Sequence, residues 1–161
     1  MLLPTPPLQP MTATHLDEVA ALERRAYAFP WTRGNFVDAL AAGHWAQAQR
    51  APDGTLTAYI VALPGVQEMH LLNLTVAPTH RRQRLATALM QALVHEAQQR
   101  HARTLWLEVR SSNTEAMALY MRLGFTQRGV RRGYYPAAHS TREDALVLAW
   151  DVAEPVHHHA A

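Results

Sequence analysis

The segment from residue 71 to residue 93, LLNLTVAPTHRRQRLATALMQAL, constrains the possible folds more than any other part of the chain. It begins with six mostly apolar residues that are typical of a buried strand. Pro78 ends that strand, because proline has no N–H group to donate to a neighbouring strand. From Leu85 onward, apolar residues recur at the three- and four-residue spacing of an amphipathic helix. The segment therefore predicts a strand, a short turn and a helix in direct succession.

The turn in this segment is basic, since Arg81, Arg82 and Arg84 lie in it and no acidic residue is near. The first turn of a helix has unpaired N–H groups and a partial positive charge, so it normally attracts acids. Three arginines at that place cost stability unless an anion binds there. The arrangement is typical of a phosphate or pyrophosphate site. Taken alone, it fits a solvated basic turn between a core strand and a surface helix equally well.

Composition narrows the class of protein. A chain of 161 residues, 48% hydrophobic and 17% charged, fits one globular domain. No apolar run approaches the roughly 20 residues that span a bilayer, and the proline-rich N-terminus does not resemble a signal peptide. We therefore expect a cytoplasmic protein without a membrane partner. The net charge of +2 is too small to indicate a nucleic-acid partner.

Two residue types are missing, and each absence excludes a reaction chemistry. The chain has no cysteine, which rules out a thiolate nucleophile and a cysteine metal site. All 15 residues in the Lys+Arg count are arginine, which rules out a Schiff-base lysine. We expect no bound metal, and we interpret His157-His158-His159 as part of a floppy tail rather than as a metal site.

Patterns along the chain predict the element order α-α-β-β-β-α-β-α-β-β. Two helices directly follow single strands and hairpins lie at either end, so we expect an α/β fold with a mixed, mostly antiparallel central sheet flanked by helices. Residues 1–10 are a proline-rich lead-in, residues 11–152 a single domain and residues 153–161 a disordered tail. The expected helices cover residues 14–28, 33–41, 85–100 and the stretch up to 123; the expected strands cover residues 45–50, 56–63, 68–76, 104–109, 125–130 and 143–152.

Several boundaries of these elements rest on particular residues. Thr14 and Thr32 are predicted to cap the first two helices, and Gly43 to end the second. Pro64-Gly65 is predicted to form the turn before the central strand. The sequence Ser112-Asn113-Thr114-Glu115 fits a capping box for the last helix, which Gly124 ends. The stretch Arg131–Arg142 is predicted to be a long loop.

Three patterns together resemble the GNAT superfamily of N-acetyltransferases. They are V-x-P-x-x-R/Q-R-x-x-x-A at residues 76–86, the acid-bearing strand LWLEVR at 105–110, and S-x-N-x-x-A-x-x-L-Y-x-x-L-G-F at 111–125. Three further segments look like the ribosomal-protein-alanine N-acetyltransferase family: FPWT at 29–32, LWLEVRSSN at 105–113, and YYP at 134–136 followed by REDA at 142–145. The resemblance extends from about Thr14 to Trp150. It implies the GNAT fold and the transfer of an acetyl group from acetyl-CoA to the N-terminal alanine of a small-subunit ribosomal protein.

The resemblance also implies a cofactor site, and the sequence departs from the family pattern there. The family's phosphate loop is Q/R-x-x-G-x-G/A, and Arg84 occupies the first glycine position. Its side chain could point outward and help to hold phosphate, or it could crowd the cofactor. The pantetheine arm is expected to pair with the backbone of the central strand, where a bulge would leave an N–H for the thioester oxygen. The residues expected to contact acetyl-CoA are Leu74, Thr75, Val76, Arg82, Gln83, Arg84, Leu85, Ala86, Thr87 and Asn113.

Two residues are candidates for acid–base chemistry. An α-amine has a pKa of about 8 and must lose a proton before it attacks, and Glu108 shares a strand face with Trp106 and Thr104, an odd place for an acid unless it lines a cleft. The alternative is a strand-end glutamate paired with Arg110 or Arg131. The resemblance assigns the acid that protonates the leaving thiolate to Tyr120, for which an ordinary core tyrosine is the alternative.

Three other polar residues are also considered for the site. Asn113, the expected cofactor contact, could instead be a helix cap. His70 and Glu68 are secondary candidates for a proton relay.

Aromatic residues predict where the acceptor binds. Trp31, Tyr134 and Tyr135 are expected to border a narrow slot that admits a small first residue, although the two tyrosines could instead only pin their loop to the sheet. Without cysteine, we expect direct transfer to the amine. Two other functions remain open at this stage, namely a small-molecule amine N-acetyltransferase and a non-catalytic acyl-CoA sensor.

Overall fold

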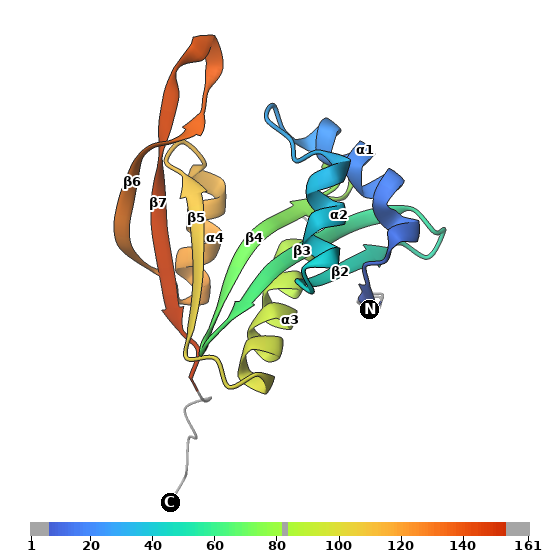
Figure 1. The fold of residues 1–161 in the computed structure, drawn as a ribbon, viewed down its shortest axis with the longest axis horizontal. Helices are drawn as coiled ribbons and strands as arrows, with labels where there is room; N and C mark the ends of the chain where they lie inside the picture. Colours follow the sequence, from blue (N-terminus) through green and yellow to red (C-terminus); the bar gives the residue numbers. More distant parts are fainter. Residues whose placement is uncertain (1–6, 82–83, 154–161) are drawn as a thin grey trace, which may run out of the picture. The chain divides into compact units, whose positions relative to one another are not determined.

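The structure is a computed structural model that describes residues 7–81 and 84–153 (Figure 1). The predictions made for Arg82, Gln83 and the tail histidines fall outside these residues. Among the described residues, none of the helices combines the length and the apolar character needed to cross a membrane.

The predicted order of helices and strands is confirmed for residues 16–151, but the structure adds a short strand at Gln9–Pro10, within the predicted proline-rich lead-in. The helices are α1 Leu16–Ala26, α2 Arg33–Ala41, α3 Leu85–Gln99 and α4 Thr114–Leu123, with short 3-10 turns at η1 Ala13–His15, η2 Pro78–His80 and η3 Ala138–Ser140. The strands are β1 Gln9–Pro10, β2 Trp45–Arg50, β3 Leu56–Gly65, β4 Glu68–Val76, β5 Thr104–Arg110, β6 Thr126–Pro136 and β7 Arg142–Asp151.

The seven strands are hydrogen-bonded in the order β1-β2-β3-β4-β5-β7-β6. β4 and β5 run parallel, and their pairing joins Glu68–Leu71 to residues 104–107. The pairs β1–β2, β2–β3, β5–β7 and β6–β7 are antiparallel. This confirms the predicted mixed, mostly antiparallel sheet. The described chain divides into two compact units, one made of residues up to 63 and 72–90, the other of residues 64–71 and 91 onward.

The first unit is built on a core between its helices and strands. In Figure 1, α1 and α2 lie on one face of β2 and β3, and α3 begins on the other face. Phe36 of α2 is fully buried, with its ring centroid 5.1 Å from that of Trp31 and 5.7 Å from that of Tyr59. Thr32 caps α2 as predicted, because its hydroxyl accepts from the backbone N–H of Asn35 at 3.1 Å.

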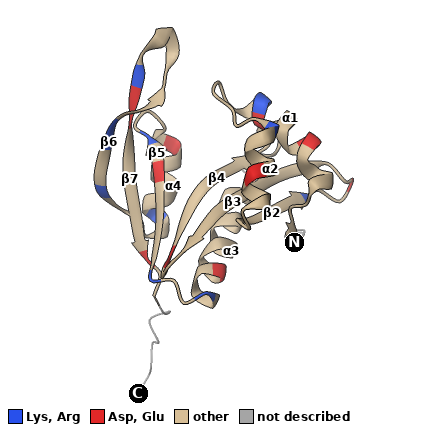
Figure 2. Ribbon diagram, viewed as in Figure 1, with Lys and Arg blue, Asp and Glu red and all other residues tan. Residues whose placement is uncertain are grey.

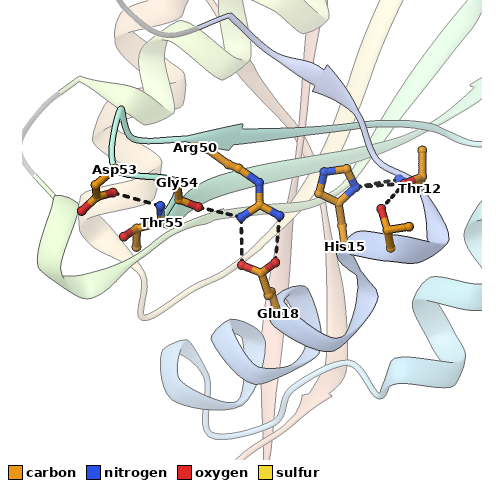
Figure 3. Close-up of polar contacts among 8 residues, drawn as sticks. Thr12, His15, Glu18, Arg50, Asp53, Gly54 and Thr55 are labelled. Carbon is orange, nitrogen blue, oxygen red and sulfur yellow. Dashed lines mark hydrogen bonds and ion pairs between the residues drawn. The ribbon is translucent and has the colours of Figure 1, made fainter.

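The start of α1 differs from the prediction. The chain enters through η1, and Thr12 rather than Thr14 precedes that turn. The Thr12 N–H donates to His15 Nδ1 at 3.0 Å, so the side chain of His15 completes the cap of this turn. Three residues after His15, Glu18 accepts two hydrogen bonds from Arg50, at 2.8 and 2.9 Å, which tie α1 to β2 (Figure 3).

The second unit contains β5, β6, β7, the first half of β4, α4 and the rest of α3. Phe125 is buried between Tyr120 and Trp150, with ring centroids at 5.7 and 5.6 Å. Gly124 has φ +124°, and a Cβ there would lie 2.9 Å from the Trp150 ring. Only glycine allows both that backbone conformation and that close contact, so α4 ends at Gly124 as predicted.

Three local predictions in this unit are wrong. The cap of α4 is Asn113, not Ser112, because Asn113 Oδ1 accepts from the Ala116 N–H at 3.1 Å while the Ser112 N–H donates to Glu143 at 2.8 Å. The turn before β4 is Val66-Gln67, since β3 continues through the predicted turn to Gly65. Gln67 takes the left-handed conformation, with φ +57°, which no glycine or asparagine at that position indicated.

The predicted long loop over Arg131–Arg142 is the third error. β6 continues to Pro136, and only residues 137–141 connect it to β7. The strand pairing is irregular between Arg131 and Tyr135. There Gly133 has φ +58°, its N–H donates to Asp144 at 2.9 Å and its carbonyl accepts from Arg142 at 2.6 Å. β6 is an edge strand with mostly exposed residues, so its sequence has no apolar alternation to reveal it.

Candidate functional site

Glu108 lies on β5, where side chains alternate between the core and a half-buried face. Leu105, Leu107 and Val109 fill the core, which places Glu108 on the other face together with Trp106 and Thr104, as predicted. Only 10% of its side chain is exposed. A carboxylate so poorly solvated needs polar partners.

Two basic side chains supply those partners. On one side, His70 of β4 contacts Glu108 through its Nε2 and the carboxylate Oε2. On the other, the Nε of Arg131 on β6 lies 3.3 Å from Oε1. The pairing with Arg131 is one of the two alternatives that the sequence left open. Figure 2 shows the acidic and basic positions on the neighbouring strands β5, β6 and β7.

These partners set the protonation of Glu108. Burial acts to raise the pKa of Glu108, but the hydrogen bond and charge of His70, together with Arg131, outweigh burial and hold the pKa below its ordinary value. Glu108 is therefore ionised at neutral pH. An ionised, half-buried carboxylate can accept a proton or pair with a cation.

Next to this carboxylate, an aromatic and ionic cluster joins β5 to the β6–β7 hairpin. The guanidinium carbon of Arg110 lies 4.5 Å from the ring centroid of Tyr135, and the same guanidinium binds Glu143 at 3.0 Å and the Pro136 carbonyl at 2.8 Å. Burial, and then the negative charge of Glu108, raise the pKa of Tyr135 to about 12. The Tyr135 phenol thus stays neutral throughout the physiological range.

Tyr134 is the more exposed of the two tyrosines, at 46%. The ring of Tyr134 meets that of Tyr135 edge-on, with the two centroids 5.0 Å apart. The guanidinium carbon of Arg131 lies 5.4 Å from the centroid of the Tyr134 ring. Arg131 therefore links Tyr134 to Glu108. The structure brings Glu108, Tyr134 and Tyr135 into one neighbourhood, on strands rather than on the predicted loop.

α4 carries the other two predicted site residues of this unit. Tyr120 is buried, with 8% of the residue exposed, and packs against Phe125. Asn113 is the N-cap of α4, which confirms the alternative role predicted for it. The roles of Tyr120 as an acid and Asn113 as a cofactor contact stay predictions.

The first unit holds the predicted cofactor strand, Leu74–Val76 of β4. The side chains of Asn73 and Thr75 are buried, and those of the residues between and beside them are half-buried. The carbonyl of Leu74 accepts a hydrogen bond from the hydroxyl of Tyr27 at 2.8 Å, and the same hydroxyl lies 2.9 Å from the Thr75 hydroxyl. The predicted bulge in this strand stays a prediction.

The sequence did not reveal the polar network behind this strand. Glu23 of α1 is 2% exposed, and its carboxylate accepts from the Tyr59 hydroxyl at 2.6 Å, from Asn73 at 3.0 Å and from the Trp31 N–H at 2.9 Å. Trp31 itself is half-buried against the core. Glu23 follows Val19 by four residues and so lies on the apolar face of the helix. This spacing was the one sign in the sequence that its carboxylate would be buried.

Arg84 precedes α3 and has φ +60°. Glycine adopts this left-handed conformation without steric cost, whereas a residue with a Cβ seldom does. Its carbonyl accepts the N–H of Ala88 at 3.1 Å, and its side chain is exposed. Leu85, Ala86 and Thr87 form the first turn of α3 and are half-buried.

Comparison with known families agrees with this architecture. The sequence profile of the Acetyltransferase (GNAT) family matches residues 16–125, which is more than half of the chain. The chain belongs to this family. It is accordingly an acetyltransferase, and its seven-stranded mixed sheet is the GNAT fold.

Three known proteins show how far the similarity extends. The chain is 36% identical over 143 residues to the ribosomal protein bS18-alanine N-acetyltransferase of Escherichia coli K12, covering 89% of this chain and 95% of the relative. The enzyme of that name from Haemophilus ducreyi is 34% identical, with 80% and 88% covered. The crystal structure of the ribosomal-protein-S18-alanine N-acetyltransferase from Escherichia coli superposes with a TM-score of 0.85, at 34% identity, covering 94% of this chain and 97% of that one.

Proposed function

We propose that this acetyltransferase transfers the acetyl group of acetyl-CoA to the N-terminal alanine of ribosomal protein bS18 in the cytoplasm. The observation that carries the proposal is the 36% identity to a bS18-alanine N-acetyltransferase over 95% of that enzyme's length. Similarity at that level over nearly a whole enzyme supports a shared acceptor as well as a shared fold. The half-buried, ionised Glu108 agrees with chemistry on an amine.

The reaction follows from the groups at hand. The neutral form of the acceptor's α-amine attacks the thioester carbonyl carbon, and as the carbon–nitrogen bond forms its nitrogen gives one proton to Glu108. The carbon–sulfur bond then breaks, and Tyr120 donates its proton to the leaving thiolate. Transfer is direct, since a chain without cysteine cannot form a thioester on itself. Glu108 and Tyr120 each perform one proton transfer.

Acetyl-CoA is assigned to the backbone of Leu74–Val76 and to the turn and first residues of α3. Arg84, with its left-handed backbone, leaves the following N–H groups in the orientation that a glycine would give them, and its exposed guanidinium is suited to a phosphate. Asn113 is proposed as a further cofactor contact. These assignments rest on the family pattern and on the local conformations.

The acceptor is proposed to bind near Tyr134 and Tyr135 of the second unit, and the expected contact of Trp31 with the acceptor stays a prediction. A wall of aromatic rings favours a small first residue, because a branched or long side chain would meet the rings. An α-amine also loses its proton more easily than a lysine ε-amine, whose ordinary pKa is about 10.4. Peptides that begin with alanine should therefore be preferred, serine and glycine starts tolerated, and internal lysines poor acceptors.

A competition assay tests the proposal. Peptides with the bS18 N-terminal sequence, beginning with Ala or Leu, are compared with the Ala peptide blocked at its N-terminus and carrying an internal lysine, and with a polyamine. We expect the Ala peptide to release CoA fastest and the blocked peptide to release almost none. Equal rates on the blocked peptide or a preference for the polyamine would contradict the acceptor. No turnover on any amine would contradict the enzyme itself.

Two variants test whether the β6–β7 hairpin contributes to the acceptor site. Tyr134→Ala and Tyr135→Ala should raise the KM for the Ala peptide while leaving the KM for acetyl-CoA unchanged. Val130→Ala, at an exposed apolar position of the same strand, is the control for general damage to β6. An unchanged peptide KM in both tyrosine variants would remove this hairpin from the acceptor site.

A further inference from the structure

His70 is the one histidine that the structure places against Glu108 among the described residues. It lies on β4 opposite Trp106 of the parallel strand β5, and 31% of its side chain is exposed. The contact joins two strands of the same unit and lies beside the group proposed as the base. Neither the fold nor the core requires a histidine at such a half-buried position.

The direction of this hydrogen bond follows from the charge of Glu108. An ionised carboxylate has only acceptor sites, so the shared proton belongs to Nε2 of His70. Oε2 is thereby occupied, while Oε1 faces the guanidinium of Arg131, whose side chain is 54% exposed. The more solvated of the two partners thus lies at Oε1. An approaching amine can reach Oε1 by displacing the exposed side chain of Arg131.

We propose that His70 is a positioning residue that fixes the Glu108 carboxylate through Oε2 and so keeps Oε1 turned toward the approaching amine. The inference rests on the proposed role of Glu108 as the base.

Two amide variants test this positioning role. In His70→Gln the amide nitrogen can take the place of Nε2, whereas in His70→Asn the side chain is too short to reach. We expect His70→Gln to keep kcat near the wild-type value at pH 8 and His70→Asn to lose about 10- to 100-fold in kcat, as expected for a displaced catalytic group. The KM for the peptide should stay within about twofold, because a group acting through Glu108 does not bind the acceptor.

Rescue by the longer amide gives the decisive readout. His95→Gln, at an exposed position of α3, is the control and should match the wild type in kcat and KM. A His70→Asn variant with full kcat, or a His70→Gln variant that loses as much kcat as His70→Asn, would overturn the proposal.

Failure of this inference differs from failure of the proposed function. If the wild type acetylates another amine in place of the Ala peptide, the acceptor is wrong and the same His70 comparison is made with that amine. If Glu108→Gln keeps full kcat, both the base and its positioning residue are overturned. If Glu108→Gln is inactive while both His70 variants behave as wild type, only the role of His70 is lost.

Discussion

At the scale of single residues, Glu108 presents a conflict that its chemistry must resolve. An ordinary glutamate is already about 3.5 pKa units less basic than an α-amine. The pKa of Glu108 lies lower still, because His70 and Arg131 outweigh the effect of burial. A complete proton transfer before attack would therefore be strongly uphill. As the proposed base, Glu108 would take the proton of an amine that is already neutral, as the carbon–nitrogen bond forms and the new positive charge on nitrogen makes that proton acidic.

This timing leads to a prediction that separates the two proposed acid–base residues. Glu108→Gln should lower kcat by about 10²–10⁴-fold, and raising the pH should restore part of the loss, because more of the amine is then neutral and hydroxide can accept the proton that Glu108 would take. Tyr120→Phe should also lower kcat, but a high pH should not restore it, since the missing group is a proton donor. Single-turnover rates between pH 6.5 and 9.5 decide the matter. Near-wild-type rates for both variants would make the two residues structural.

The buried carboxylate of Glu23 gives a prediction about stability. Burial, and then the hydrogen bond to Glu23, raise the pKa of Tyr59, so its hydroxyl remains a donor throughout the accessible pH range. Tyr59→Phe removes that donor at 2.6 Å without removing the ring, and should lower the free energy of unfolding by about 1–3 kcal/mol. Chemical denaturation measures the change. Tyr134→Phe, at an exposed ring, is the control, and an equal loss there would contradict this account.

Replacing Arg84 is predicted to change the free energy of unfolding in the opposite direction. A side chain at φ +60° carries strain of about 1–2 kcal/mol that glycine avoids, while glycine loses about 0.5–1 kcal/mol through chain entropy. Arg84→Gly should thus leave the apoprotein as stable as the wild type or stabilise it by up to about 1 kcal/mol. Gly43→Ala is the matched reverse change, at φ +79° with no atom within 4 Å of the added Cβ, and should destabilise. A large loss of stability in Arg84→Gly would show that the side chain holds the turn.

At the scale of elements, the sequence indicated those strands and helices that have a buried side. β5 alternates buried and half-buried residues, and β3 is almost wholly apolar over its first seven residues, so both were located within one or two residues. β6 was cut short at Val130, because an exposed edge strand carries no alternation and Gly133 bends it through a left-handed residue. Tyr134 and Tyr135 were identified as site candidates, but their support by Arg131 and Arg110 required the pairing of β6 with β7.

The ion pair between Glu18 of α1 and Arg50 of β2 allows a test of how the free energy of unfolding depends on pH. Hydrogen bonds from Arg50 lower the pKa of Glu18 more than its slight burial raises it. A carboxyl with a lowered folded-state pKa stabilises the fold above its ordinary value of 4.5, and that contribution is lost as the pH falls through the folded-state value. Since the Glu18 side chain is 50% exposed, the pair should be worth only about 0.5 kcal/mol.

Glu18→Gln should therefore lower the unfolding free energy slightly at pH 7, and the difference from the wild type should vanish near pH 3. Urea titrations at the two pH values measure it, and a double-mutant cycle with Arg50→Gln isolates the pair. Because Arg50 also donates to the Gly54 carbonyl at 2.8 Å, Arg50→Gln alone should cost more than Glu18→Gln alone. If the difference in unfolding free energy between Glu18→Gln and the wild type grew at low pH, the stabilising role assigned to the ionised Glu18 would be contradicted.

At the scale of the whole molecule, the family assignment predicts that acetyl-CoA stabilises the folded chain. A ligand that binds only the folded state contributes about 2.7 kcal/mol at 100 times its dissociation constant. For a chain of 161 residues this corresponds to a rise of about 5–10 °C in Tm. Because the proposed contacts include a basic turn for the phosphates, CoA should give most of the shift and pantetheine, which lacks the phosphates, little of it. Arg84→Gly then distinguishes the two possible roles of the arginine: a smaller shift identifies a phosphate ligand, and a larger one an obstruction. Thermal scans at millimolar ligand that show no shift with acetyl-CoA would contradict its assignment to Leu74–Val76 and to the turn before α3, however similar the sequence is to its relatives.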